Sequence, residues 1–150
     1  MHTSTVAFRA LVFVAGLFPL AAQTASNSCS VNPALAEPAS GPAWNGWGAG
    51  ISNSRFQTAQ GAQMTASQVP HLKLKWAYGL AGAKQVFGAP VVVAGRVFFA
   101  DDNGVVYSLN ADSGCVYWSF HAEAGVRNAL SIRAANGSST AYFEIGRAHV

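Results

Sequence analysis

The stretch Asn110-Ala111-Asp112-Ser113-Gly114-Cys115-Val116-Tyr117-Trp118 decides the fold of this chain. Its first half has the residue types of a tight turn, because Asn, Asp and Ser side chains hydrogen-bond to nearby backbone and Gly tolerates positive φ. Its second half is rich in β-branched and aromatic residues, which are typical of a strand. The stretch therefore predicts a turn that leads into a strand carrying Trp118.

Short apolar runs separated by turn residues surround this stretch. The connections are Ala94-Gly95 and Asp101-Asp102-Asn103-Gly104, which have the residue types of hairpin turns. We predict four strands, at Pro90–Val93, Arg96–Ala100, Val105–Leu109 and Cys115–Phe120. Strands of this length with connections this tight predict an antiparallel meander, of the size of one β-propeller blade.

A second tryptophan makes the pattern periodic. Leu72–Tyr78 alternates apolar with polar residues, which predicts a strand with one buried face. Its Trp76 precedes Trp118 by 42 positions, and a propeller blade repeats every ~40–50 residues. A further blade is expected to begin at Ala129–Ile132 and to continue at Ala141–Phe143. The predicted fold class is therefore all-β, an incomplete β-propeller with a tryptophan repeated from blade to blade and about two of the ~4–8 blades that closure needs.

The N-terminal residues have the pattern of an export signal. Arg9 precedes an apolar run, Ala10–Leu20, and small residues follow that run. The run is shorter than the ~20 residues of a membrane span. We therefore predict that residues 1–26 are a signal peptide, that no membrane span remains after cleavage, and that the protein is periplasmic or secreted. An uncleaved anchor is the alternative.

Residues 27–43 have no apolar period and are rich in Ala, Pro, Ser and Asn, which predicts a linker before the propeller residues 44–143. This linker holds Cys29, one of 2 cysteines in the chain. Export permits a disulfide with Cys115, but 86 positions separate the two and Cys115 lies in a predicted strand. We therefore expect Cys115 to be a buried free thiol.

The last residues do not continue the strand pattern. Ile145–Val150, back-translated as ATC GGA AGA GCA CAC GTC, spells the start of a common short-read sequencing adapter. We therefore expect the natural sequence to end near Phe143 and residues 144–150 to be a sequencing artefact. The chain would then be an N-terminal fragment, which is expected to be inactive by itself.

The turn and its tryptophan resemble the docking repeat of quinoprotein dehydrogenases, which runs roughly Ala-x-Asp-x-x-Thr-Gly-x-x-x-Trp. In this chain Asn110 stands in the usual Asp position and Ser113 in the usual Thr position. The resemblance implies that the Gly closes the turn and that the Trp stacks on a neighbouring blade. The residues expected to hold blades together, and not to contact a ligand, are Trp76, Asp112, Gly114 and Trp118.

The resemblance narrows to the opening of polyvinyl-alcohol dehydrogenases at Trp44–Gly48, Asn53–Phe56 and Val69–Trp76, and covers roughly Ala43 to Phe143. It implies a periplasmic alcohol dehydrogenase that uses pyrroloquinoline quinone (PQQ) and, in the full-length protein, Ca²⁺. It also implies a carboxylate base that takes the hydroxyl proton, and a cytochrome c that receives the electrons. The base and the calcium ligands are expected beyond this chain, which carries no assigned metal ligand.

Arg127, in Gly125-Val126-Arg127-Asn128, is the candidate cofactor-binding residue. PQQ bears carboxylates, and Arg binds a carboxylate through two parallel charged hydrogen bonds. Arg127 follows a docking strand, where propeller loops tend to face the central channel. The more ordinary alternative is a solvated loop arginine.

Other aromatic and acidic residues favour structural roles. Trp44 and Trp47 could stack on a planar ligand, but we expect them to pack an outer strand on the propeller. Asp101, Asp102 and Asn103 offer oxygens of the kind that Ca²⁺ prefers, yet without the spacing of the remaining ligands. We therefore interpret these three residues as a turn.

The remaining patterns exclude several kinds of site. His71 and His121 have no partner at metal-ligand spacing, and no Cys-x-x-Cys-His haem motif occurs. The formal net charge of +3 includes Arg9 of the predicted signal peptide, so the rest is close to neutral. This charge balance therefore gives no indication of a basic surface that would bind nucleic acid.

The same architecture also hosts proteins that are not enzymes. The alternative function is a propeller scaffold that binds partner proteins, of the outer-membrane assembly type. That scaffold is membrane-anchored, whereas Ser26-Asn27-Ser28 before Cys29 does not match a lipidation sequence. The sequence therefore favours the enzyme.

Overall fold

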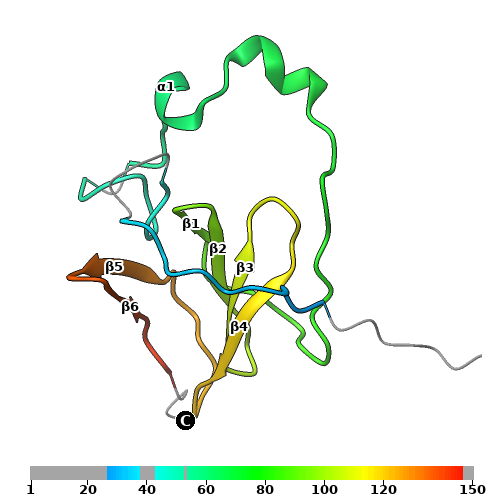
Figure 1. The fold of residues 1–150 in the computed structure, drawn as a ribbon, viewed down its shortest axis with the longest axis vertical. Helices are drawn as coiled ribbons and strands as arrows, with labels where there is room; N and C mark the ends of the chain where they lie inside the picture. The colour runs from blue at the N-terminus through cyan, green and yellow to red at the C-terminus, as the bar shows by residue number, and fades with distance from the viewer. Residues whose placement is uncertain (1–26, 38–42, 53, 147–150) are drawn as a thin grey trace, which may run out of the picture.

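The computed structural model describes residues 27–37, 43–52 and 54–146 (Figure 1). The predicted signal peptide lies outside the described residues. Within them, no helix is long and apolar enough to cross a membrane. The described elements are α1 (Ala59–Ala62), a 3-10 helix (Ala66–His71), β1 (Val91–Val93), β2 (Arg96–Ala100), β3 (Val105–Asn110), β4 (Val116–His121), β5 (Ser131–Ala135) and β6 (Ser138–Tyr142).

The strands β1 to β4 form one antiparallel sheet in sequence order. Arg96 at the start of β2 lies opposite Asn110 at the end of β3. The ladder between β3 and β4 shifts register between Ser108 and Leu109. Each of the three connecting turns contains a glycine at positive φ, namely Gly95, Gly104 and Gly114. The antiparallel meander predicted from the sequence is confirmed.

The strands β5 and β6 form a separate antiparallel hairpin beside this sheet (Figure 1). Its turn has Asn136 and Gly137 at positive φ, which suits the twist of a two-residue hairpin. The core lies between the hairpin and one face of the four-stranded sheet. It is built from Val91, Val93, Phe98, Ala100, Val106, Ala122, Val126, Leu130 and Ile132. Antiparallel sheets with little helix confirm the all-β class and agree with an incomplete propeller.

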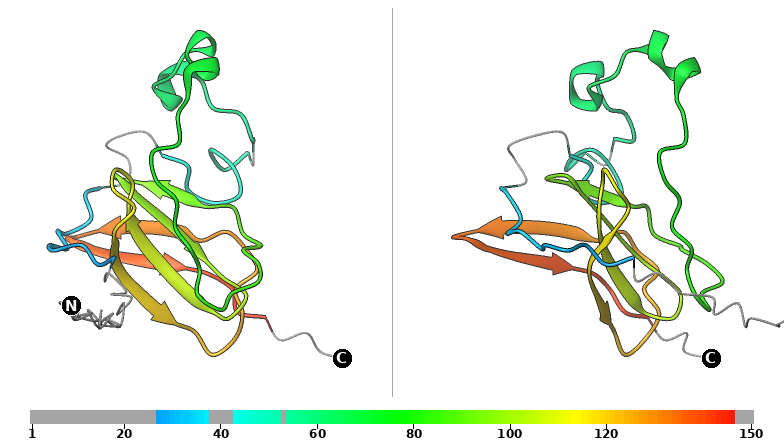
Figure 2. Two further views of the ribbon diagram at one scale, coloured as in Figure 1. Left: turned by 90° about the vertical axis from the view of Figure 1, so that its right-hand side faces the viewer. Right: turned by 45° about the vertical axis from the view of Figure 1, so that its right-hand side comes forward.

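The predicted strand at Leu72–Tyr78 is not a strand in the structure. The segment is extended and runs along the four-stranded sheet on the side away from the β5–β6 hairpin (Figures 1 and 2). The ring of Tyr78 lies 6.1 Å from that of Phe99 and 5.7 Å from that of Tyr107. The prediction is wrong because a strand needs a neighbour for its backbone groups, and no described strand flanks this segment.

The residues predicted as a linker begin with an arm that is attached to the sheet. The backbone N–H of Val116 donates to the Asn27 carbonyl at 2.7 Å, and that of Cys29 donates to the Val116 carbonyl at 2.9 Å. Leu35 packs against the core. The arm therefore covers the free edge of β4 at its beginning.

The stretch that starts at Trp44 joins the two sheets. Trp44 and Val92 exchange two backbone hydrogen bonds of 2.8 and 2.9 Å, which extends the sheet beyond β1. The Asn45 side chain donates to the carbonyl of Ile132 and accepts from its N–H, both at 2.7 Å. One short stretch thus contacts an edge of each sheet.

Candidate functional site

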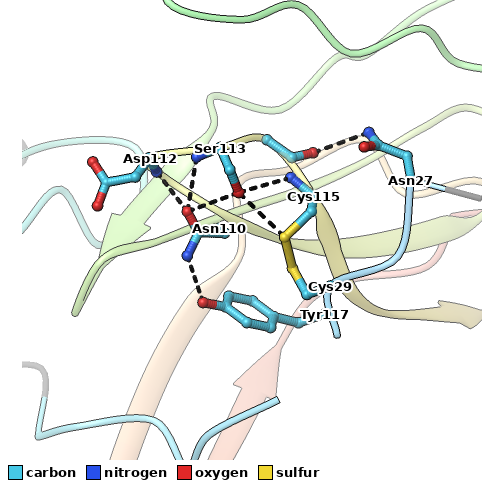
Figure 3. The surroundings of a disulfide bond; sticks show 8 residues. Asn27, Cys29, Asn110, Asp112, Ser113, Cys115 and Tyr117 are labelled. Atoms are coloured by element: carbon cyan, nitrogen blue, oxygen red, sulfur yellow. Dashed lines mark hydrogen bonds between the residues drawn. A yellow bond between two sulfur atoms is a disulfide. The ribbon is translucent and has the colours of Figure 1, made fainter. Parts of the chain in front are cut away.

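The turn Asn110–Gly114 is held by the side chain that begins it. Asn110 Oδ1 accepts the backbone N–H groups of Asp112 and Ser113, both at 2.8 Å (Figure 3). The backbone N–H of Gly114 donates to the Asn110 carbonyl at 2.9 Å, and Gly114 has a φ of +73°. Asn replaces the usual Asp of the motif here because the turn needs only a side-chain oxygen at this position.

Trp76 lies on this turn. Its indole Nε1 donates to the Ala111 carbonyl at 3.0 Å. Its ring covers Gly114 so closely that a Cβ there would lie 2.7 Å from Trp76 Cδ2. Only glycine therefore provides both the positive φ of the turn and room for the indole.

An exposed ion pair lies beside the indole. Lys75 Nζ donates to Asp112 Oδ1 at 2.6 Å. This hydrogen bond and the nearby positive charge lower the pKa of the Asp112 carboxyl. The structure thus brings together three of the residues selected from the sequence, Trp76, Asp112 and Gly114.

Trp118 lies apart from that group, in β4. Its ring centroid is 6.1 Å from that of Phe98, on the side of the sheet that faces the hairpin. Next to Trp118 is an open, largely apolar hollow of about 530 Å³, with the side chain of Phe120 55% exposed. Unlike Trp76, Trp118 is not seated on a turn in the part of the chain that the structure describes.

The prediction of a free thiol at Cys115 is wrong, because Cys115 forms a disulfide with Cys29 (Figure 3). The two Cα atoms lie 5.1 Å apart, and Cys115 precedes β4 instead of lying within it. The arm brings Cys29 there through its hydrogen bonds to Val116. Sequence separation was a poor guide, since it does not limit which residues of a folded chain can meet. The signal that could have found the bond is an even number of cysteines in a chain expected to be exported.

A buried arginine attaches the same arm a second time. The guanidinium of Arg96, 6% exposed, donates to the Pro33 carbonyl and stands 4.0 Å from the centroid of the Tyr117 ring. Burial lowers the pKa of this guanidinium. Its environment of a carbonyl and an aromatic face suits a weakly hydrated planar cation. Nothing in the sequence around Arg96 distinguished it from an exposed strand arginine.

The acidic turn is an internal hydrogen-bond centre. Asp101, 1% exposed, accepts the backbone N–H groups of Asn103 at 3.0 Å and Val105 at 2.9 Å, and the Tyr107 hydroxyl at 3.0 Å. Burial and then this hydrogen bond raise the pKa of Tyr107 to about 12. The side chain of Asp101 thus hydrogen-bonds within the hairpin that contains it, as expected for a turn residue.

Arg127 is exposed in the loop after β4. Its guanidinium lies 5.4 Å from the centroid of the Phe87 ring. A hollow of about 260 Å³ opens beside it, lined by Arg127, Asn128, Glu144, Ile145 and Gly146. The last three of these residues belong to the stretch expected to be a sequencing artefact, so the shape of this hollow carries no argument for a ligand.

The surroundings of Arg127 do not by themselves fit PQQ. A planar group with several carboxylates needs more than one charged donor and a free flat face. Here one guanidinium is available, and it engages the aromatic ring of Phe87. No group of three or more His, Cys, Asp or Glu in the described residues could hold a metal ion.

The remaining candidates are two tryptophans and two histidines. Trp44 pairs with the edge of the sheet, as expected for an outer strand, whereas the Trp47 side chain is 45% exposed. His71 and His121 are both exposed. The described residues therefore show structural contacts at Trp44 and no chemical site at the histidines.

Two curated proteins are similar to this chain. It is 48% identical over 89 residues to a polyvinylalcohol dehydrogenase of Pseudomonas sp, an alignment that covers 59% of this chain and 13% of that protein. It is 38% identical over 106 residues to a polyvinylalcohol dehydrogenase of Sphingopyxis sp. (strain 113P3), over 71% of this chain and 16% of that protein. No family model and no solved structure matches the chain. The chain thus resembles polyvinyl-alcohol dehydrogenases, as the sequence predicted, and spans less than a fifth of their length.

Proposed function

We propose that this chain is part of a PQQ-dependent alcohol dehydrogenase of the polyvinyl-alcohol type. The observation that carries the proposal is the 48% identity over 89 residues to a protein of that name. PQQ would supply the oxidising power for removing two electrons from an alcohol. The onward acceptor would be a cytochrome c, and Ca²⁺ would accompany the quinone in the full-length protein.

A periplasmic location agrees with the covalent structure. The disulfide between Cys29 and Cys115 ties the arm to the sheet. Such bonds persist in oxidising compartments, which include the bacterial periplasm. The disulfide therefore supports export, in agreement with the signal peptide predicted for residues 1–26.

The role proposed for the described residues is to hold blades together. Trp76, Asp112 and Gly114 meet at one turn. Trp118 is the tryptophan that corresponds to Trp76 in the next repeat. Arg127 is the one residue proposed to contact the cofactor, through a carboxylate. The scaffold alternative receives no support from the two similar proteins, since both are named as dehydrogenases.

The decisive experiment uses the full gene. The purified protein, with PQQ and Ca²⁺ added, should reduce an artificial electron-accepting dye when polyvinyl alcohol or a small secondary alcohol is supplied. The same protein without PQQ is the control. Absence of both PQQ binding and alcohol-dependent dye reduction would show that the proposal is wrong. The present chain alone should give no dye reduction.

The proposed cofactor contact has a matched control in the same chain. Arg127→Ala should weaken PQQ binding on the order of tenfold or more, because a charged bidentate hydrogen bond is lost. Arg133→Ala removes another exposed arginine, in β5, and should leave PQQ binding unchanged. Equal PQQ affinity of the two variants would return Arg127 to the solvated-loop interpretation while leaving the enzyme proposal intact.

A further inference from the structure

We propose that Asn136 is a site of spontaneous deamidation, at which the side-chain amide is converted to a carboxylate by the neighbouring backbone nitrogen and water. The reaction needs no enzyme and is separate from the proposed dehydrogenase activity. The inference comes from a comparison of the Asn-Gly dipeptides of the chain, which are Asn45-Gly46, Asn103-Gly104 and Asn136-Gly137.

The chemistry needs an asparagine side chain and the nitrogen of the next residue. A glycine in that next position favours the reaction, because it has no side chain to obstruct its nitrogen. The Gly137 nitrogen, after losing its proton to hydroxide, attacks Asn136 Cγ. The new N–Cγ bond closes a succinimide ring while the Cγ–Nδ2 bond breaks, and the side-chain nitrogen takes up a proton and leaves as ammonia. Water then opens the ring at either carbonyl, which leaves aspartate or isoaspartate at position 136.

Both reacting groups of Asn136-Gly137 are free. The two residues are exposed in the turn between β5 and β6, which projects from the body of the molecule (Figure 2). Within the described residues, neither the Asn136 side chain nor the Gly137 N–H has a hydrogen-bond partner. A Cβ at Gly137 would meet nothing within 4 Å, so the space around this residue is open. The nitrogen can therefore approach Cγ without displacing a packed group.

Asn45-Gly46 has the same sequence, but its amide is engaged. Asn45 Nδ2 donates to the Ile132 carbonyl and Asn45 Oδ1 accepts the Ile132 N–H, both at 2.7 Å. The Asn45 residue is also half-buried. Both hydrogen bonds must break before the amide can turn toward the Gly46 nitrogen and leave. The structure therefore protects Asn45.

At Asn103-Gly104 it is the attacking nitrogen that is engaged. The Gly104 N–H donates to the Asp101 carbonyl at 3.1 Å, and a Cβ at Gly104 would lie 2.6 Å from the Ala124 carbonyl oxygen. The buried Asp101 carboxylate also accepts the Asn103 N–H at 3.0 Å. A negative charge this close opposes loss of the Gly104 amide proton. The turn therefore holds the nitrogen away from reaction, although the Asn103 side chain is exposed.

Deamidation would change the hairpin in two ways. Either product places a negative charge at position 136. Isoaspartate also lengthens the main chain in the loop between Ala135 and Ser138, which lie opposite each other at the end of the β5–β6 ladder. A two-residue hairpin loop matches the twist of its strands only with its own backbone geometry. The isoaspartate form should therefore lose strand pairing at this end of the hairpin.

Peptide mapping by mass spectrometry, after incubation at mildly alkaline pH, tests the inference. In the folded chain Asn136 should convert on the order of tenfold or more faster than Asn45 and Asn103, whose hydrogen bonds must first open. In urea the three sites should convert at similar rates, because only the shared Asn-Gly sequence remains. Chromatography of the 136 peptide should separate aspartate from isoaspartate.

A matched pair of variants identifies the site independently of mapping. Asn136→Gln should abolish the early acidic species seen by isoelectric focusing, because the longer side chain closes its ring far more slowly. Asn103→Gln changes another exposed Asn-Gly dipeptide and should leave that species unchanged. An acidic species that forms as fast in Asn136→Gln as in the parent chain would overturn the inference.

The order of the three rates gives the second way to refute it. Conversion of Asn45 or Asn103 as fast as that of Asn136 in the folded protein would show that the structure does not select the site. If the present chain gives equal rates with and without urea, the same mapping in the longer polypeptide decides. Asn136 converting first there supports the inference, and any other order overturns it. Neither result bears on alcohol oxidation.

Discussion

Two segments beside the same sheet are held in opposite ways. The arm 27–35 has no strand pattern, yet it is attached by a disulfide, backbone hydrogen bonds and the buried Arg96. The segment Leu72–Tyr78 has a clear strand pattern, yet only its side chains hold it. The comparison teaches that alternation predicts which way side chains point, whereas attachment depends on which partner is present.

The largest effect is expected from cutting the covalent attachment of the arm. Cys29→Ser opens a loop that spans 86 positions, and closing such a loop stabilises by roughly 4–5 kcal/mol through lost disorder of the unfolded chain. Urea unfolding measures the loss of free energy of unfolding. Cys115→Ser and the double variant should lose the same amount, because all three remove one bond. Losses that add in the double variant would contradict the disulfide.

The next effect is expected where the segment contacts the turn. Trp76→Ala removes a half-buried indole and its hydrogen bond to Ala111, which should lower the free energy of unfolding by roughly 2–3 kcal/mol. Trp76→Phe keeps a ring but lacks the N–H, and should lose about 1 kcal/mol. Both are measured by urea unfolding. A Trp76→Ala variant as stable as the parent chain would mean that the indole does not hold the segment.

Gly114 lies where the two segments meet, and Gly137 provides a matched control. Both have a φ of +73°, but a Cβ at Gly114 meets Trp76 whereas a Cβ at Gly137 meets nothing within 4 Å. Gly137→Ala should therefore cost about 1 kcal/mol of backbone strain alone. Gly114→Ala should cost about 2 kcal/mol and should increase the exposure of Trp76, measured by fluorescence quenching. Equal losses of stability at the two glycines would mean that the contact with the Trp76 indole does not contribute to the cost at Gly114.

The other end of the segment Leu72–Tyr78 contacts Tyr107 through the ring of Tyr78, and the Tyr107 hydroxyl can be titrated. Its pKa is raised to about 12, above its ordinary value of 10. The neutral phenol therefore stabilises the fold fully below pH 10, and this stability is lost as the pH rises toward 12. Absorbance titration should show one tyrosine that ionises last. Tyr107→Phe should abolish that step and cost about 1 kcal/mol through the lost bond to Asp101.

The smallest effect is expected at the exposed ion pair between Lys75 and Asp112. The hydrogen bond from Lys75 lowers the pKa of Asp112. The pair therefore contributes above the ordinary pKa of Asp112, and this contribution is lost as the pH falls through the lowered value. Asp112→Asn should barely change unfolding, because exposed pairs are screened. Lys75→Met should return the Asp112 pKa, followed by NMR, toward its ordinary value; an unchanged pKa would contradict the pair.

Local chemistry made most of the sheet predictable. The turn at Asn110–Gly114 and the strand rhythm around it depend on neighbours in sequence, so β1 to β4 were found within a few residues. The sites were predicted less well. The sequence selected Trp76 and Gly114 as residues that hold blades together, and this role stays a prediction; that the two meet at the turn was shown only by the structure. The sequence missed the roles of Asn45 and Arg96, whose partners Ile132 and Pro33 lie far away in sequence.

The sequence by itself determined the turn and the alternation, because both depend on neighbouring residues, and the 42-residue period, because a repeat is visible in the order of residues without any knowledge of contacts. Only the tertiary structure decided that Cys29 meets Cys115 and that Leu72–Tyr78 lies unpaired on the sheet. The physical reason is that a disulfide and a β-ladder both need a second segment brought within bonding distance. That second segment is chosen by the packing of the whole chain.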